Sequence, residues 1–123
     1  MKMRCELSAS LVVGFLALAW ALPARAAEAL FAERPVARRM GDVTRIRFAV
    51  STPTDVEVAV LDAGGRVVRQ LAAGVLGGAK APPSPFEPGL AQDLPWDGKD
   101  DLGRPARGGP FRARVRAGMS VEF

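Results

Sequence analysis

Segments in which apolar and polar residues alternate, each bounded by Gly, Pro or Asp, limit the fold of this chain more than any other feature. In residues 44–50 one side of the alternation is formed by Thr44, Ile46, Phe48 and Val50, and the other by Arg45, Arg47 and Ala49. A strand points successive side chains to opposite faces, so this pattern predicts a half-buried strand. Similar segments lie at residues 56–60, 66–71, 94–96 and 111–116. Because no stretch after residue 27 has a sustained helical period, we expect an all-β fold.

The residues between these segments are typical of turns and loops. Asp62-Ala63-Gly64-Gly65 is predicted to join two of the strands as a hairpin, because its glycines accept positive φ. Residues 74–91 are rich in Gly and Pro, with prolines at 82, 83, 85 and 88. Proline cannot donate a ladder hydrogen bond, so this segment predicts a long surface loop of extended character.

The number of strands indicates the architecture. Residues 27–42 are ambiguous, because Pro35 interrupts their pattern, and we interpret them as a linker or an edge strand. With them included, the chain has six or seven short strands, which is typical of an antiparallel β-sandwich. We expect the sandwich to occupy residues 43–118.

The first 26 residues have the organisation of a secretory signal peptide. Lys2 and Arg4 precede an uncharged run over residues 7–22, and Ala24-Arg25-Ala26 provides the small-x-small pattern of a cleavage site. A membrane-spanning helix needs about 20 apolar residues, more than this run supplies. Cleavage after residue 26 would remove the only cysteine, Cys5. We therefore expect an exported protein, periplasmic, surface-bound or secreted, that folds without a disulfide.

Composition argues against most catalytic and metal chemistry. The chain has no His, which removes imidazole as a base, as a member of a catalytic triad and as a metal ligand. Ser51, Ser84 and Ser120 stand in no motif that would activate a hydroxyl. We expect a non-enzymatic protein with no catalytic residue, no cofactor and no metal ligand.

The acidic residues near the C-terminal strand do not have the spacing of a known calcium loop. If Asp97 is position one of an EF-hand loop, Lys99 falls on position three and Leu102 on position six, where an oxygen ligand and a glycine are needed. Asp100 and Asp101 are instead expected in a solvated turn. A structural role for these carboxylates is therefore a better interpretation than calcium binding.

Two further features are open to a binding interpretation. Arg112, Arg114 and Arg116 alternate with apolar residues, and we interpret them as the solvent face of a strand rather than as a nucleic-acid surface. Phe86, in the Pro-rich loop, is the one aromatic residue that we expect to be exposed. It is the single candidate for binding a glycan.

Two linked motifs resemble the FlgD-type immunoglobulin-like domain, which is named after the flagellar hook-capping protein. The first motif has the pattern Asp-x-x-Gly-(Arg/Lys)-x-Val-Arg-x-Leu, and the matching residues are Asp62, Gly65, Arg66 and Leu71. The second combines Trp-Asp-Gly-(Lys/Arg)-Asp-x-x-Gly with a later Gly-x-(Tyr/Phe), and the matching residues are Trp96, Asp97, Gly98, Asp100, Gly103, Gly109 and Phe111. The resemblance covers residues 56–115 and implies an immunoglobulin-like sandwich. Phe111 stands where the family usually has Tyr.

The motif residues also have a structural explanation that needs no family. Trp96 ends an alternating segment on its inward side and is expected to fill the core between two sheets. The carboxylate of Asp97 is expected to accept local backbone N–H groups, with Gly98 at positive φ. Asp100 and Gly103 are expected to form a second turn of the same kind.

The resemblance implies a function through architecture rather than chemistry. FlgD-type domains are accessory modules of exported bacterial proteins, so we expect a structural or interaction module of the cell envelope or of a secreted protein. Its partner would be a protein or a neighbouring domain, with no nucleic acid and no transmembrane segment after leader cleavage. The alternatives are a glycan- or calcium-binding accessory module and a sorting-like domain of type IX secretion. Residues 119–123 alternate again, and we interpret them as a truncated strand or the start of a following segment, in a truncated reading frame.

Overall fold

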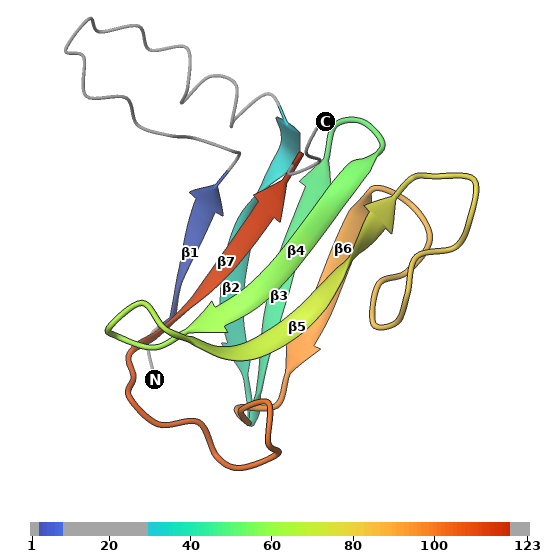
Figure 1. The fold of residues 1–123 in the computed structure, drawn as a ribbon. Coiled ribbons are helices and arrows are strands. Elements are labelled where there is room, and N and C mark those ends of the chain that lie inside the picture. The colour runs from blue at the N-terminus through green and yellow to red at the C-terminus, as the bar shows by residue number, and fades with distance from the viewer. Residues whose placement is uncertain (1–2, 9–29, 119–123) are drawn as a thin grey trace, which may run out of the picture.

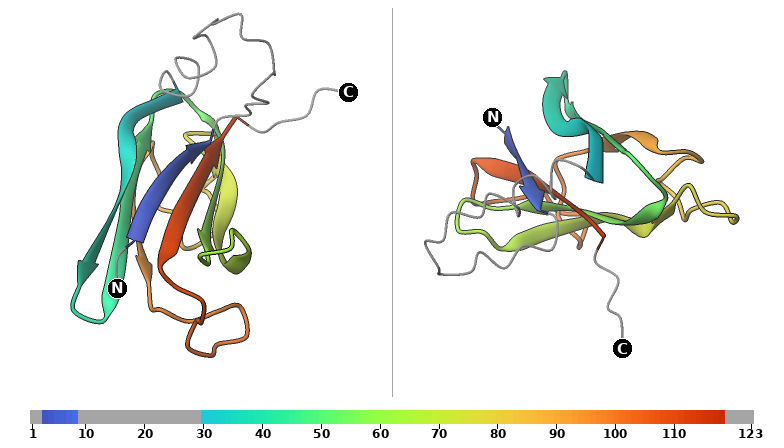
Figure 2. Two further views of the ribbon diagram at one scale, coloured as in Figure 1. Left: turned by 90° about the vertical axis from the view of Figure 1, so that its left-hand side faces the viewer. Right: turned by 90° about the horizontal axis from the view of Figure 1, so that it is seen from above.

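The computed structural model of the chain describes residues 3–8, by their backbone, and residues 30–118. All regular elements in these ranges are strands: β1 (Met3–Ser8), β2 (Phe31–Met40), β3 (Val43–Val50), β4 (Thr54–Leu61), β5 (Val67–Leu76), β6 (Ala91–Trp96) and β7 (Phe111–Ala117). They form one sheet in the order β1-β7-β4-β5 and a second in the order β2-β3-β6. The two sheets face each other as layers (Figures 1 and 2). The predicted all-β fold is confirmed.

Pairing is antiparallel within both sheets except at β1. In the larger sheet β4 lies between β5 and β7, with Val58 opposite both Ala72 and Val115. In the smaller sheet β3 lies between β2 and β6. β1 runs parallel to β7 at the edge of the larger sheet.

The core lies between the sheets and is formed by the inward residues of the alternating segments. Along β7 buried and half-buried residues alternate at every position, as the pattern of a strand with one dry face requires. The largest fully buried side chains come from both layers and are Trp96, Phe48, Phe111, Ile46, Leu76 and Leu94. Burial of these apolar groups is the main force that holds the layers together.

The ends of the described chain extend beyond the expected domain limits. Of the residues interpreted as a linker or an edge strand, 31–40 form β2, at one edge of the smaller sheet. From the segment interpreted as a leader, residues 3–8 form β1, while residues 9–26 lie outside the described residues. Residues 119–123, interpreted as a truncated strand, also lie outside them.

The Pro-rich loop is shorter and better packed than the sequence suggests. β5 continues to Leu76 and β6 begins at Ala91, so the loop comprises residues 77–90. The expectation that Phe86 is exposed was wrong: its side chain is only 4% exposed and belongs to the core. The buried Gln92 holds the loop there. Its Oε1 accepts the Glu87 N–H at 2.9 Å, and its Nε2 donates to the Glu87 carbonyl at 2.7 Å.

Candidate interaction site

The β4–β5 turn and the β6–β7 loop, which contain the two motifs, come together at one end of the molecule (Figure 1). The N–H of Ala63, in the turn, donates to the carbonyl of Gly108, in the loop, at 2.7 Å. A Cβ at Gly108 would lie 3.4 Å from the Cβ of Asp62. The first motif and the end of the second are therefore in direct contact.

Each turn is closed by an aspartate that accepts backbone N–H groups. Asp62 Oδ1 accepts from Gly64 and from Arg66, both at 2.9 Å. Asp100 Oδ1 does the same in the loop, accepting from Leu102 at 2.9 Å and from Arg104 at 3.0 Å. Short polar side chains stabilise turns in this way because they replace water at donors that the turn leaves unpaired.

The first turn of the loop is built on the same principle. Asp97 Oδ1 accepts the Lys99 N–H at 3.0 Å, and Gly98 has a φ of +81°. Gly103 has a φ of +79° and donates its N–H to the carbonyl of Asp100 at 3.0 Å. These left-handed conformations are strained for any residue with a Cβ, which explains why glycine is needed at both positions.

The loop is bonded to the edge of β5. The Asp101 N–H donates to the Val68 carbonyl at 3.0 Å, and Asp101 Oδ1 accepts the Gln70 N–H at 2.9 Å. The Arg69 side chain donates to the Asp100 carbonyl at 3.2 Å. β5 is an edge strand, so this loop satisfies backbone groups that would otherwise be open to pairing with another chain.

A small apolar cluster supports the loop from beneath. Val60, Trp96 and Phe111 form it, and Leu71 packs against it. The indole N–H of Trp96 donates to the Lys99 carbonyl at 2.9 Å. Trp96 therefore anchors the loop by a hydrogen bond as well as filling the core.

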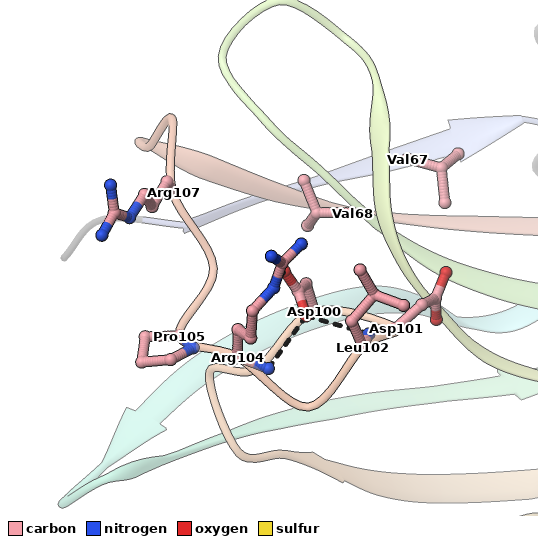
Figure 3. Close-up of a pocket in the computed structure, with 8 residues that line it drawn as sticks. All are labelled: Val67, Val68, Asp100, Asp101, Leu102, Arg104, Pro105 and Arg107. Carbon is pink, nitrogen blue, oxygen red and sulfur yellow. Dashed lines mark hydrogen bonds and ion pairs between the residues drawn. The ribbon is translucent and has the colours of Figure 1, made fainter.

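A pocket of about 750 Å³ lies between the start of β5 and the loop. Its apolar lining includes Leu102, which is 73% exposed, and Val67, which is 44% exposed. Arg104 and Arg107 supply positive charge. Figure 3 shows the Arg104 guanidinium beside Asp100, whereas Arg107 points away from the other labelled side chains.

The electrostatics of the pocket centre on Asp100. Its pKa is lowered from the ordinary value of 3.8, first by the hydrogen bond from the Arg104 N–H and then by that from the Leu102 N–H. The positive charges of Arg104 and Arg69 lower its pKa further, while desolvation opposes the shift. A carboxylate held in this way is a fixed part of the turn and not a proton donor at neutral pH.

The structure brings the motif residues to this end but gives them supporting positions. Asp62, Gly65 and Arg66 lie in the β4–β5 turn, Leu71 lies in β5, and Gly109 precedes β7. The surface residues of the pocket are the ones that sequence reasoning missed. Leu102 and Val67 are apolar residues beside turn glycines or charged neighbours. An apolar residue in such a polar segment was the only sequence signal available.

A second hollow, of about 640 Å³, lies on the outer face of the smaller sheet. Its lining includes Arg38, Arg45 and Arg47 with Val36. Asp93 partly neutralises it, because its carboxylate lies 3.0 Å from Arg45 Nε and 3.9 Å from Arg47 Nε. This hollow contains none of the motif residues.

Within residues 3–8 and 30–118, no group of three or more His, Cys, Asp or Glu side chains is placed to hold a metal ion. The same part of the chain contains no helix with the length and apolar character to cross a membrane. Comparison of the chain with protein-family models, with curated proteins and with solved structures found no match.

Proposed function

We propose that the chain is a non-enzymatic, exported bacterial structural or interaction module with a FlgD-type immunoglobulin-like sandwich. In this proposal the pocket between β5 and the β6–β7 loop is the surface that contacts a protein partner or a neighbouring domain. The organisation of residues 1–26 supports export. The two stacked sheets support the sandwich, and the two motifs, which meet at one end of it, support the family assignment.

The observation that best supports a binding role is that the polar and the apolar side chains at this end of the sandwich have different roles. The carboxylates of Asp62, Asp97, Asp100 and Asp101 all accept backbone N–H groups. Apolar side chains are left exposed beside them, with Leu102 the most exposed large one among the described residues. Exposed apolar groups with Arg nearby are typical of protein interfaces, in which Arg is enriched.

The chemistry of the pocket defines the partner surface that fits it. Leu102 and Val67 offer contacts to an apolar side chain, and Arg104 and Arg107 offer contacts to carboxylates near that side chain. The glycan alternative has lost its only candidate residue, because Phe86 is buried. We therefore propose a protein surface that combines an apolar anchor with acidic neighbours.

Site-specific photocrosslinking in the source bacterium tests this role. A photoreactive amino acid replaces Leu102 in the full chain, and the control replaces Val36, which is 59% exposed on the smaller sheet. We expect one discrete crosslinked protein from position 102, lost when Val67 is also changed to Glu, and none from position 36. Equal crosslinking at both positions, or none at 102, would contradict the proposed binding surface.

Export is tested on the same protein. The chain recovered from the envelope or the medium should have lost residues 1–26, which intact mass and N-terminal sequencing measure. A chain that keeps its first residues and stays in the cytoplasm would refute export while leaving the crosslinking result to be judged separately.

A further inference from the structure

β1 occupies the gap at one side of the two layers. It pairs with β7 in parallel over six positions, from Met3 opposite Phe111 to Ser8 opposite Arg116. It also lies beside β2, the edge of the other sheet (Figure 2). The edge of β7 is therefore shaped to receive one extended strand, and a strand is present there in the uncleaved chain.

The residues that pair with this edge belong to the segment that has the organisation of a signal peptide. This inference rests on the export proposed above. Cleavage after residue 26 would remove β1. β7 would then present one side of its backbone without a ladder partner, next to side chains that are now fully buried: Phe111, Ala113 and Val115. An open edge of this kind pairs readily with another extended segment.

The residues of β7 define what that segment must look like. Its inward positions are apolar and its outward positions are Arg112, Arg114 and Arg116. Arg114 is only 17% exposed and bonds Glu57 at 3.1 Å. A carboxylate on the incoming strand at this level would add a second ion pair to that guanidinium. In the register of β1 this position is taken by Glu6.

Charge argues against a second copy of β7 as the occupant. Antiparallel pairing of two β7 edges about Arg114 would place Arg114 opposite Arg114 and Arg112 opposite Arg116. Like charges directly opposite one another destabilise a strand pair. A heterologous segment with acidic residues avoids this repulsion.

We propose that the β7 edge of the processed protein binds an extended segment of another polypeptide, running parallel to β7. That segment alternates apolar with polar residues and carries a carboxylate at the level of Arg114. The N-terminal strand holds this edge closed until processing opens it.

The test uses the processed protein purified from an exporting host, with its N-terminus determined. The probe is a synthetic peptide of residues 1–10 added in trans, and its binding is measured by fluorescence anisotropy. We expect binding that weakens roughly fivefold with the Glu6→Gln peptide, the size of one partly exposed ion pair. This difference should disappear in an Arg114→Gln protein and persist in an Arg38→Gln control, whose change lies on the other sheet.

Hydrogen exchange gives the second measurement. The β7 amides that do not pair with β4 should exchange faster in the processed protein than in the uncleaved chain, and the peptide should restore their protection. Absence of binding, binding indifferent to Glu6, or a processed dimer with protected β7 amides would each overturn the proposal.

If the host leaves the chain uncleaved, export fails and the edge is tested directly. Cys5→Pro and Leu7→Pro in the full chain prevent β1 from pairing. Binding of the peptide to this variant, with the same dependence on Glu6, supports the β7 site without export. No binding by a variant whose circular dichroism shows a folded sandwich overturns it.

Discussion

The rings of Trp96 and Phe111 meet edge to face, with their centroids 5.3 Å apart and their planes at 74°. Trp96 ends β6 in the smaller sheet and Phe111 begins β7 in the larger one, so the contact crosses from one layer to the other. Such pairs are favourable because the positive edge of one ring faces the negative face of the next. The contact lies beneath the loop that forms the pocket, and Trp96 also bonds that loop through the Lys99 carbonyl.

Removing the indole should destabilise the protein strongly. Trp96 is 2% exposed, and Trp96→Ala should lower the free energy of unfolding by about 3–5 kcal/mol, because large aromatic-to-alanine changes leave a cavity. Urea unfolding followed by circular dichroism measures the loss. The control is Leu102→Ala, an exposed position at which a change of under about 0.5 kcal/mol is expected. Similar small effects at both positions would place the indole outside the core.

The bond between the loop and β5 should be visible at a single amide. Asp101→Ala removes the acceptor for the Gln70 N–H and should cost about 1 kcal/mol, the usual net value of such a bond. Asp101→Asn keeps an oxygen at this place and should cost less. Hydrogen exchange at Gln70 should accelerate in the Ala variant. Unchanged protection there would show that the loop does not close this edge.

Acid should weaken the loop turn through Asp100. Its pKa in the folded protein lies below 3.8 because the Arg104 and Leu102 N–H groups hold the charged form. The unfolded chain therefore binds the proton more readily, so the contribution to stability is complete above the unfolded pKa and is lost as the pH falls through the folded pKa.

NMR titration of the carboxyl carbon measures this shift directly. Asp100→Asn should reduce the loss of stability on acidification, measured by urea midpoints. Leu102→Ala should not, because it keeps both backbone donors. A midpoint for Asp100 at or above 3.8 would contradict the assigned hydrogen bonds.

Gln92 should be more important for stability than its polar character suggests. Gln92→Leu leaves the N–H and the carbonyl of Glu87 without the partners they have now. Unsatisfied groups of this kind cost about 1–3 kcal/mol each when they stay dry. Thermal unfolding should show the loss, and Gln92→Glu should not recover it, because a carboxylate cannot donate to the carbonyls of Glu87 and Gly89 as the amide does. A fully stable Leu variant would mean that water replaces these bonds.

Gly74 should tolerate no side chain. A Cβ there would lie 2.6 Å from Pro83 Cδ and 2.8 Å from its Cγ, so Gly74→Ala must displace the loop from β5. We expect a loss of about 1–3 kcal/mol, as for other overpacked sites, together with faster exchange in residues 77–90. Gly78→Ala is the matched control, because its Cβ would meet only the tip of Val75, at 3.3 Å.

The alternating segments could be predicted because their signal is local. Residues 44–50 match β3, and Asp62 to Gly65 form the expected turn between β4 and β5. Phe86 could not be placed in this way, because its burial depends on Gly74 admitting the Pro83 ring and on Gln92 holding the next residues. The one available sign of this packing was Gln92, a polar residue at an inward position of β6.

The turns that support the candidate site could be predicted from the sequence, but the exposed residues that line its pocket could not. The turn aspartates accept the local N–H groups that their spacing suggests. The contact between Asp101 and β5 joins residues 31 positions apart, and no local pattern contains that information. For the same reason the pairing of β1 with β7 could not be predicted, since it joins the two ends of the described chain.

The position of β7 has a consequence for the order of folding. This late strand is central in the larger sheet, where β4 pairs with it along one side. Until residues 111–117 have been synthesised, β4 lacks that neighbour and the core lacks one of its walls. Contacts of such long sequence separation form slowly. A nascent chain would therefore complete its core only after this strand has been synthesised.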